Sequence, residues 1–336
     1  MLSSLSNGLR LIGRHKKAVV CLYLANLLVA SSLIFSFMEI FDRSLGQGLY
    51  REELVQTMNY DWYRLFQENV GGVGSTFGPS VMGSGPFLRN LEMLLDGRLD
   101  RIPGTILLLA VLYLLFNSFF IAALVGSFVL YPLGTSWREF FRTGGIFFGR
   151  FLRLSFLALL TFTLLYAVVT KPLEYLVGYM ATIVTTDIAA FYCSLVRYLI
   201  VLSLFMFVNM VLDYTKVRTV LENRTSILLA FISSWSFCVG YLGTTLRLYS
   251  LLVLIHVGWV LIYAGLGSSL IQVQNAWGIF GFFIWQQVFM AGRLVVKMLF
   301  TGSQMNLYTD LRPSLEPIVE TRQAMNPQTM VTVVGP

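Results

Sequence analysis

Two residues of opposite charge, Asp213 and Arg293, lie within or beside largely apolar stretches. Asp213 follows the run NMVL, and Arg293 lies within QQVFMAGRLVVKMLF. Inside a bilayer, such charges are costly unless they pair with each other. We therefore expect a structural Asp213–Arg293 ion pair between two membrane helices, with Lys216 or Arg218 as competing partners for the acid. A role in moving protons or substrate, or in binding a headgroup, is the functional alternative.

A second set of candidate residues is basic and lies between the hydrophobic stretches. Basic residues at the cytoplasmic surface of a membrane attract anionic lipid, at about 1 kcal/mol each. Such a rim gives a membrane protein possible contacts with anionic headgroups. The residues that we expect to make these contacts are Arg138, Arg142, Arg150, Arg153, Lys216 and Arg218.

The remaining polar residues of the apolar stretches suit packing better than catalysis. His256 is alone in its stretch, and Arg197 can reach the membrane surface. Asn26, Asn117 and Asn209 can form hydrogen bonds between helices. The sequence has no Ser–His–Asp arrangement, HExxH motif or paired carboxylates, and its three cysteines are far apart. We expect neither an enzyme nor a cofactor or metal site.

Long apolar stretches must position these residues. Of the 336 residues, 56% are hydrophobic and only 12% are charged, whereas a soluble domain has about 25% charged residues. Because about 20 apolar residues cross a hydrocarbon core of about 30 Å as a helix, we expect an all-α polytopic transmembrane helix bundle. Its six expected spans cover residues 18–38, 105–131, 154–170, 190–212, 247–266 and 277–300.

The distribution of positive charge predicts the orientation. Lys and Arg are frequent before the first span, in 133–153 and after the fourth span, but rare in 171–189 and 267–276. Cytoplasmic loops carry the excess of Lys and Arg, so we expect both termini in the cytoplasm. The net charge of +7 is spread over these clusters, and we expect no nucleic-acid partner.

Two shorter apolar stretches are ambiguous. Lys171 to Asp187 is too short and too charged for a span, so we expect a helical extension or a short helix at the outer interface. Ser226 to Gly243 is long enough to cross the membrane, but serines interrupt it. We favour a cytoplasmic interfacial or re-entrant helix because Arg247 then marks an inner boundary; a true span is the alternative.

Residues 39–104 form an extracytoplasmic helical insertion between the first two spans. Residues 53–69 have apolar side chains, including Trp62 and Phe66, near helical spacing. Gly71 to Pro86 is rich in glycine and does not favour a helix. Pro86 to Gly97 has the proline and glycine that begin and end a helix. The insertion is either a lid or docking surface, or a helical hairpin lying on the membrane.

The expected organisation has four parts, of which the last is a flexible cytoplasmic tail rich in proline. The tail follows the last span and has little periodicity. The parts are 1–38 (N-terminus and first span), 39–104 (insertion), 105–309 (five-span membrane domain) and 310–336 (tail).

Three segments carry a family resemblance: NMVLDYTKVRTVLENR (209–224), REFFRTGGIFFGRFLRL (138–154) and QQVFMAGRLVVKMLFTGSQMNLY (286–308). Together they resemble a family of uncharacterised bacterial membrane proteins, distantly similar to the membrane domain that accompanies some glycerophosphodiester phosphodiesterases. The resemblance covers about residues 105–310. It implies a helical membrane domain in the bacterial inner membrane, and not an activity, because no phosphodiesterase part is present.

The function that we expect is non-enzymatic. The protein would be an integral membrane subunit or scaffold that binds membrane lipids and other integral membrane proteins. The alternative is a transporter or lipid-handling protein that uses the basic cytoplasmic rim. A transporter should have a polar cavity that reaches the middle of the membrane, lined by residues such as Asn117, Asn209 and His256.

Overall fold

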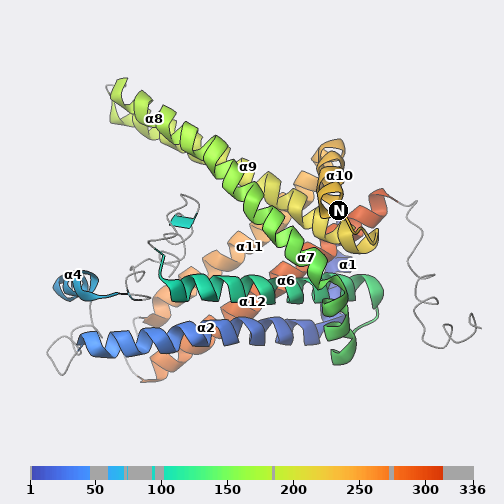
Figure 1. The fold of residues 1–336 in the computed structure, drawn as a ribbon, viewed down its shortest axis with the longest axis horizontal. Helices are drawn as coiled ribbons and strands as arrows, with labels where there is room; N and C mark the ends of the chain where they lie inside the picture. Colours follow the sequence, from blue (N-terminus) through green and yellow to red (C-terminus); the bar gives the residue numbers. More distant parts are fainter. Residues whose placement is uncertain are drawn as a thin grey trace, which may run out of the picture.

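The computed structural model describes residues 2–45, 60–71, 74, 93–94, 102–183, 186–271 and 276–312. Within these ranges every regular element is a helix (Figure 1). Six helical segments are long and apolar enough to cross a membrane, which confirms the all-α polytopic bundle. These segments are Lys16–Ser44, Gly104–Leu130, Trp137–Met180, Asp187–Leu221, Leu242–Gly267 and Trp277–Leu311.

The described elements are all helices, one of them a π-helical turn. They are α1 (Leu2–Arg14), α2 (Lys16–Leu45), α4 (Tyr60–Asn69), α6 (Gly104–Leu130), α7 (Trp137–Leu165), the π-helical turn η3 (Tyr166–Thr170), α8 (Lys171–Ile183), α9 (Asp187–Leu221), α10 (Ile227–Gly240), α11 (Leu242–Ile271) and α12 (Ala276–Leu311).

Helix α7 begins earlier than the expected third span. A capping box fixes its start: the Glu139 amide donates to the Ser136 side chain, and the Glu139 carboxylate accepts from the Ser136 amide. Most of the basic stretch 133–153 is therefore helical. At its other end α7 continues through η3 into α8, so the predicted helical extension at Lys171 is confirmed.

Helix α10 is not among the six candidate spans. Its 14 residues extend over about 21 Å, less than the hydrocarbon core of about 30 Å. Its exposed side chains are large and apolar, and include Leu228, Leu229, Ile232 and Val239. This length favours the interfacial or re-entrant interpretation over a true span.

Buried residues gather toward one end of the bundle. In α9, ten residues between Val208 and Val220 are buried, whereas none is buried from Asp187 to Phe207. In α6, the nine buried residues all lie between Ser118 and Phe128. We call the end with the buried residues the closed end, and the opposite end, which includes Gly104 and Asp187, the open end.

At the closed end the helices form one continuous core. Met210 and Tyr214 of α9, Leu248 of α11 and Met298 of α12 all belong to it. Helix α1 packs across α12, where a Cβ added to Gly302 would lie 3.2 Å from the Gly8 Cα. Close packing of this kind is typical of the interior of a folded domain.

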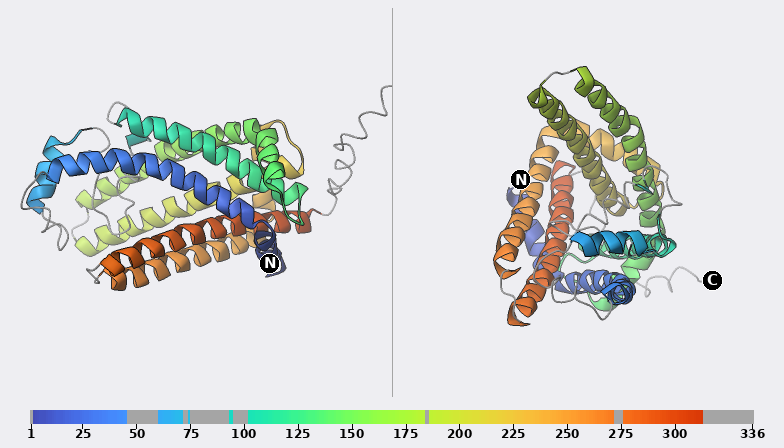
Figure 2. Two further views of the ribbon diagram at one scale, coloured as in Figure 1. Left: turned by 90° about the horizontal axis from the view of Figure 1, so that it is seen from below. Right: turned by 90° about the vertical axis from the view of Figure 1, so that its left-hand side faces the viewer.

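Toward the open end the helices separate (Figure 2), and the contacts there are largely pairwise. Helices α11 and α12 remain joined, because Tyr263 stacks on Phe289 at 4.0 Å and the Trp285 indole donates to the Tyr263 carbonyl. Helices α8 and α9 form a separate hairpin, in which Arg197 lies 4.0 Å from Glu174. Arg197 thus has a partner near this end of the bundle.

Part of the insertion lies against the open end of α2. Trp62 and Phe66 of α4 are buried against Phe37 and Phe41, as the helical spacing in the sequence indicates. The glycine-rich stretch, the predicted helix at Pro86–Gly97 and the tail lie almost wholly outside the described residues.

Candidate functional site

Arg293 is a charged residue at the middle of a membrane-spanning helix. It lies at the middle of α12 and is exposed. Its guanidinium carbon is 5.8 Å from the centre of the Phe289 ring, and it is close enough to Tyr113 and His256 to interact with both electrostatically. No carboxylate among the described residues lies within 4.0 Å of it.

The position of Arg293 along α12 places it inside the bilayer. Along the helix axis, Leu299 is about 9 Å and Ser303 about 15 Å from Arg293. Leu299 and Ser303 face Gly8 of α1. In the other direction Trp277 is about 24 Å away. With a hydrocarbon core of about 30 Å, both directions place Arg293 well below either membrane surface. An exposed charge at this depth is a functional-site candidate by default.

Lys297, one turn further along α12, is a second cation in the same region. Its ammonium donates a hydrogen bond of 3.1 Å to Asn117 Oδ1 in the middle of α6. Beside it is a cavity of about 20 Å³, lined by residues that include Asn26 and Tyr113. A cavity of this size holds about one water, so it is too small for a transported substrate.

The structure pairs Asp213 with Lys216 and not with Arg293. The Lys216 ammonium donates to Asp213 Oδ1 at 2.7 Å, so the expected Asp213–Arg293 pair is replaced by one of its competing alternatives. The physical reason is local: the two residues are three apart on α9 and face the same side. Arg293, by contrast, extends toward Phe289. Lys297 of α12 is close enough to Asp213 to interact with it electrostatically.

The expected headgroup contacts divide into two groups. Arg138, Arg142 and Arg153 are exposed on α7. Arg150 donates to Asn223 Oδ1 at 2.6 Å. Arg218 is only 3% exposed, because it lies inside the core and pairs with Glu222 at 2.8 Å. The prediction of a headgroup contact is therefore wrong for Arg218. The Lys216 side chain, for which the same contact was expected, forms an ion pair with Asp213.

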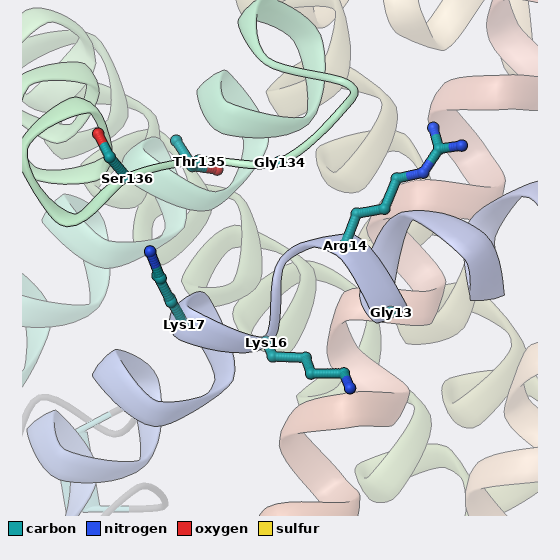
Figure 3. Close-up of a pocket in the computed structure, with 7 residues that line it drawn as sticks. All are labelled: Gly13, Arg14, Lys16, Lys17, Gly134, Thr135 and Ser136. Carbon is teal, nitrogen blue, oxygen red and sulfur yellow. The ribbon is translucent and has the colours of Figure 1, made fainter.

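A basic pocket lies at the junction of α1, α2 and α7 (Figure 3). It measures about 510 Å³ and is lined by Arg14, Lys16, Lys17 and the loop Gly134–Ser136. Arg14 also donates to the Pro132 carbonyl at 3.2 Å. Ligand pockets have volumes of about 300–1,000 Å³, so the space suits an anionic headgroup. The Glu139 carboxylate already caps α7 here, which leaves the three bases as the anion-binding groups.

Two further residues, His15 and Glu222, organise the closed end; sequence reasoning missed His15, whereas the spacing of Arg218 and Glu222 already indicated a pair on one helical face. His15 is 2% exposed, and its ring nitrogens lie 2.9 Å from the Leu11 carbonyl and 3.1 Å from the Tyr131 carbonyl. Glu222 accepts hydrogen bonds from Tyr308 and from Arg224. The only signal for Glu222 in the sequence is its spacing of four residues from Arg218. His15 has no local signal at all.

Glu222 and its hydrogen-bond donors Arg218, Arg224 and Tyr308 form the Glu222 cluster, in which the donors lower the pKa of the carboxyl. Burial alone would raise the pKa of the Glu222 carboxyl, but hydrogen bonds from Arg218, Tyr308 and Arg224 outweigh burial and hold that pKa below its usual value. The carboxylate is thus charged at neutral pH and fixes the end of α9 against α12. Its role is structural, because Arg218 and Tyr308 are buried at the closed end and Arg224 covers them from the exposed loop after α9.

Another polar residue of the spans, Asn209, forms a hydrogen bond to a neighbouring helix. Asn209 donates to the Tyr249 hydroxyl at 2.7 Å, which links α9 to α11. In the described part of the chain, no three His, Cys, Asp or Glu side chains group so that they could hold a metal ion.

No family model, curated protein or solved structure matches this chain. The resemblance inferred from the three sequence motifs therefore stays a prediction.

Proposed function

We propose that this protein is a non-enzymatic integral membrane subunit or scaffold, whose separated open-end helices bind other membrane components. The observation that carries the proposal is the uneven burial of the spans. From Asp187 to Phe207 and from Lys171 to Ile183, none of the described side chains is buried. Helices that are packed at one end and separate at the other leave room for the helices of another protein.

The small size of the cavity beside Lys297 supports a binding role over transport. A transporter needs a polar cavity that reaches the middle of the membrane. Asn117 does lie at that depth, but the space beside it holds about one water. Asn209 uses its side-chain amide for a contact with Tyr249. The polar residues proposed to line a cavity thus join helices to one another.

The proposed location is the bacterial inner membrane, with both termini in the cytoplasm. The first and last described helices, α1 and α12, meet at the closed end, where Ser4 donates to the Asp310 carboxylate at 3.3 Å. The exposed arginines Arg138, Arg142 and Arg153 lie on α7 near the same end. An excess of basic residues marks the cytoplasmic side.

Purification from the native membrane in a mild detergent tests this function. Mass spectrometry would then identify all proteins and lipids that stay bound in fixed ratio. We expect at least one other integral membrane protein in a fixed stoichiometric ratio with this chain. A monomer that carries no protein partner under several mild detergents would contradict the proposal.

A lipid-handling role is the second candidate, and the basic pocket favours it. Arg14, Lys16 and Lys17 line a space of about 510 Å³ with side chains that point in different directions (Figure 3), and an anionic headgroup would lie over this basic surface. Native mass spectrometry with phosphatidylglycerol and phosphatidylcholine would test this role. Preferential binding of the anionic lipid that is lost when Lys16 and Lys17 become Gln would support lipid handling; equal binding of both lipids would contradict it.

A further inference from the structure

Neither of the two cations near the middle of α12 forms a salt bridge with an acid of the described chain, although Asp213 lies close enough to Lys297 to attract it. Lys297 donates to the neutral Asn117, and the Arg293 guanidinium lies over the ring of Phe289. Lys297 and Arg293 are also close enough to repel each other. Two unpaired positive charges inside a bilayer are costly, and such residues pair with an opposite charge or face water.

We propose that Arg293, supported by Lys297, binds a carboxylate carried by a transmembrane helix of a partner protein. This inference rests on the proposed function and states the chemistry of the partner. A helix with one Asp or Glu at mid-membrane depth would pack against the open-end half of α12, and its carboxylate would form an ion pair with Arg293.

The exposure of Arg293 is what makes a partner helix the best occupant. Arg293 is accessible, whereas Lys297 is largely enclosed by α2, α6 and α12. The guanidinium has five N–H donors in a planar arrangement that matches a carboxylate. The exposed apolar side chains Phe283, Ile284 and Val288 precede it on α12, and such side chains suit contact with an apolar helix.

The described spans of a second copy of this chain do not supply the carboxylate. In the described spans, the acids lie near helix ends, as Glu39 and Asp187 do, or pair locally, as Asp213 does with Lys216. An anionic lipid is also a poor occupant, because its headgroup would have to leave the membrane surface and lose its hydration. An acidic residue in a transmembrane helix is already held at this depth by its own chain.

The test uses the full-length protein in phosphatidylcholine vesicles with a defined probe. The probe is a fluorescent transmembrane peptide of leucine and alanine with one glutamate at its midpoint. A matched peptide carries glutamine there. Energy transfer to a fluorophore on the protein reports binding. We expect the glutamate peptide to bind at least tenfold more tightly than the glutamine peptide.

Three variants assign the effect to Arg293. R293Q should abolish the preference for glutamate, and R293K should keep most of it because the positive charge remains. R247Q is the matched control, since Arg247 is also an exposed arginine but lies at the closed end of α11; it should keep the full preference. Equal binding of both peptides to the wild-type protein would overturn the inference.

A second arm separates this inference from the proposed function. Wild type, R293Q and R247Q are each purified from the native membrane, and bound proteins and lipids are quantified. A protein partner that stays bound to R293Q as well as to R247Q would overturn the carboxylate inference alone. A fatty acid or phospholipid lost only from R293Q would assign the site to an amphiphile and overturn it as well. The absence of any partner from the wild type would contradict the proposed function itself.

Discussion

The closed and open ends of this bundle share the six spans, but helices α1 and α10 pack only at the closed end, and the two ends are stabilised in different ways. At the closed end, Tyr214, Phe237 and Tyr308 pack ring against ring with almost no exposed surface. Toward the open end, comparable aromatic residues are exposed, such as Phe191 at 63% and Phe283 at 52%. The described part of the chain is therefore packed at its closed end and exposed at its open end.

The largest expected contrast compares a phenylalanine from each end. Phe237 is 2% exposed in the closed-end core, so F237A should lower the free energy of unfolding by about 3–5 kcal/mol. F283A, at the open end, should change it by less than about 0.5 kcal/mol. Denaturant titration in a mild detergent measures both. Equal losses would show that the open end is packed as firmly as the closed end.

The Glu222 cluster gives the closed end a pH dependence. Because the pKa of Glu222 is lowered in the folded protein, its ion pairs stabilise the fold above the unfolded pKa of about 4.3. This stabilisation is lost as the pH falls through the lower, folded pKa.

The variant E222Q isolates that effect. It should destabilise the protein by about 3 kcal/mol at pH 7, since it leaves Arg218 buried without its anion. Between pH 5 and pH 3, thermal unfolding should shift less in E222Q than in the wild type. Parallel curves for the two proteins would show that other carboxylates are responsible.

Two glycines offer a smaller contrast within one pair of helices. A Cβ on Gly126 of α6 would lie 2.3 Å from Thr143 Cγ2 of α7, whereas nothing lies within 4 Å of Gly145. G126A should cost about 1–3 kcal/mol through overpacking. G145A should stabilise slightly, by up to about 1 kcal/mol, because alanine favours the helix. A stable G126A protein would mean that α6 and α7 are less tightly packed than their buried residues indicate.

The smallest expected effect on stability is that of Arg293. Because its side chain is exposed and pairs with no acid of the described chain, R293Q should leave the purified protein as stable as the wild type, within about 0.5 kcal/mol. Differential scanning fluorimetry in detergent measures the change. A decrease of several degrees in the unfolding temperature would indicate that Arg293 forms a structural ion pair, as its sequence context predicts.

The sequence was sufficient to predict the six spans but neither helix α1 nor the contacts between the helices. Apolar length alone predicts six spans, because crossing a bilayer requires a run of about 20 residues. The pairing of Asp213 could not be predicted, since Lys216 and Arg293 were both compatible with its depth. Likewise, the burial of Arg218 depends on where Glu222 and Tyr308 meet, which links residues 86 positions apart.

The difference between the two ends was also absent from the sequence. The first and second halves of α9 are both apolar, and only the packing shows that one is buried and the other is not. In a soluble protein, exposed apolar surface marks such a region. In a membrane helix, lipid-facing and partner-facing residues have the same composition, so the three-dimensional arrangement is required.

Site-specific photocrosslinking in the native membrane tests the central claim most directly. A photoreactive residue would replace Val288 at the open end, which is 44% exposed, or Leu246 at the closed end, which is 43% exposed. We predict that the Val288 position crosslinks to one integral membrane protein with an acidic residue in a transmembrane helix, and that R293Q removes this product. The Leu246 position should crosslink only to lipid. Crosslinks to lipid alone from both positions would contradict the account.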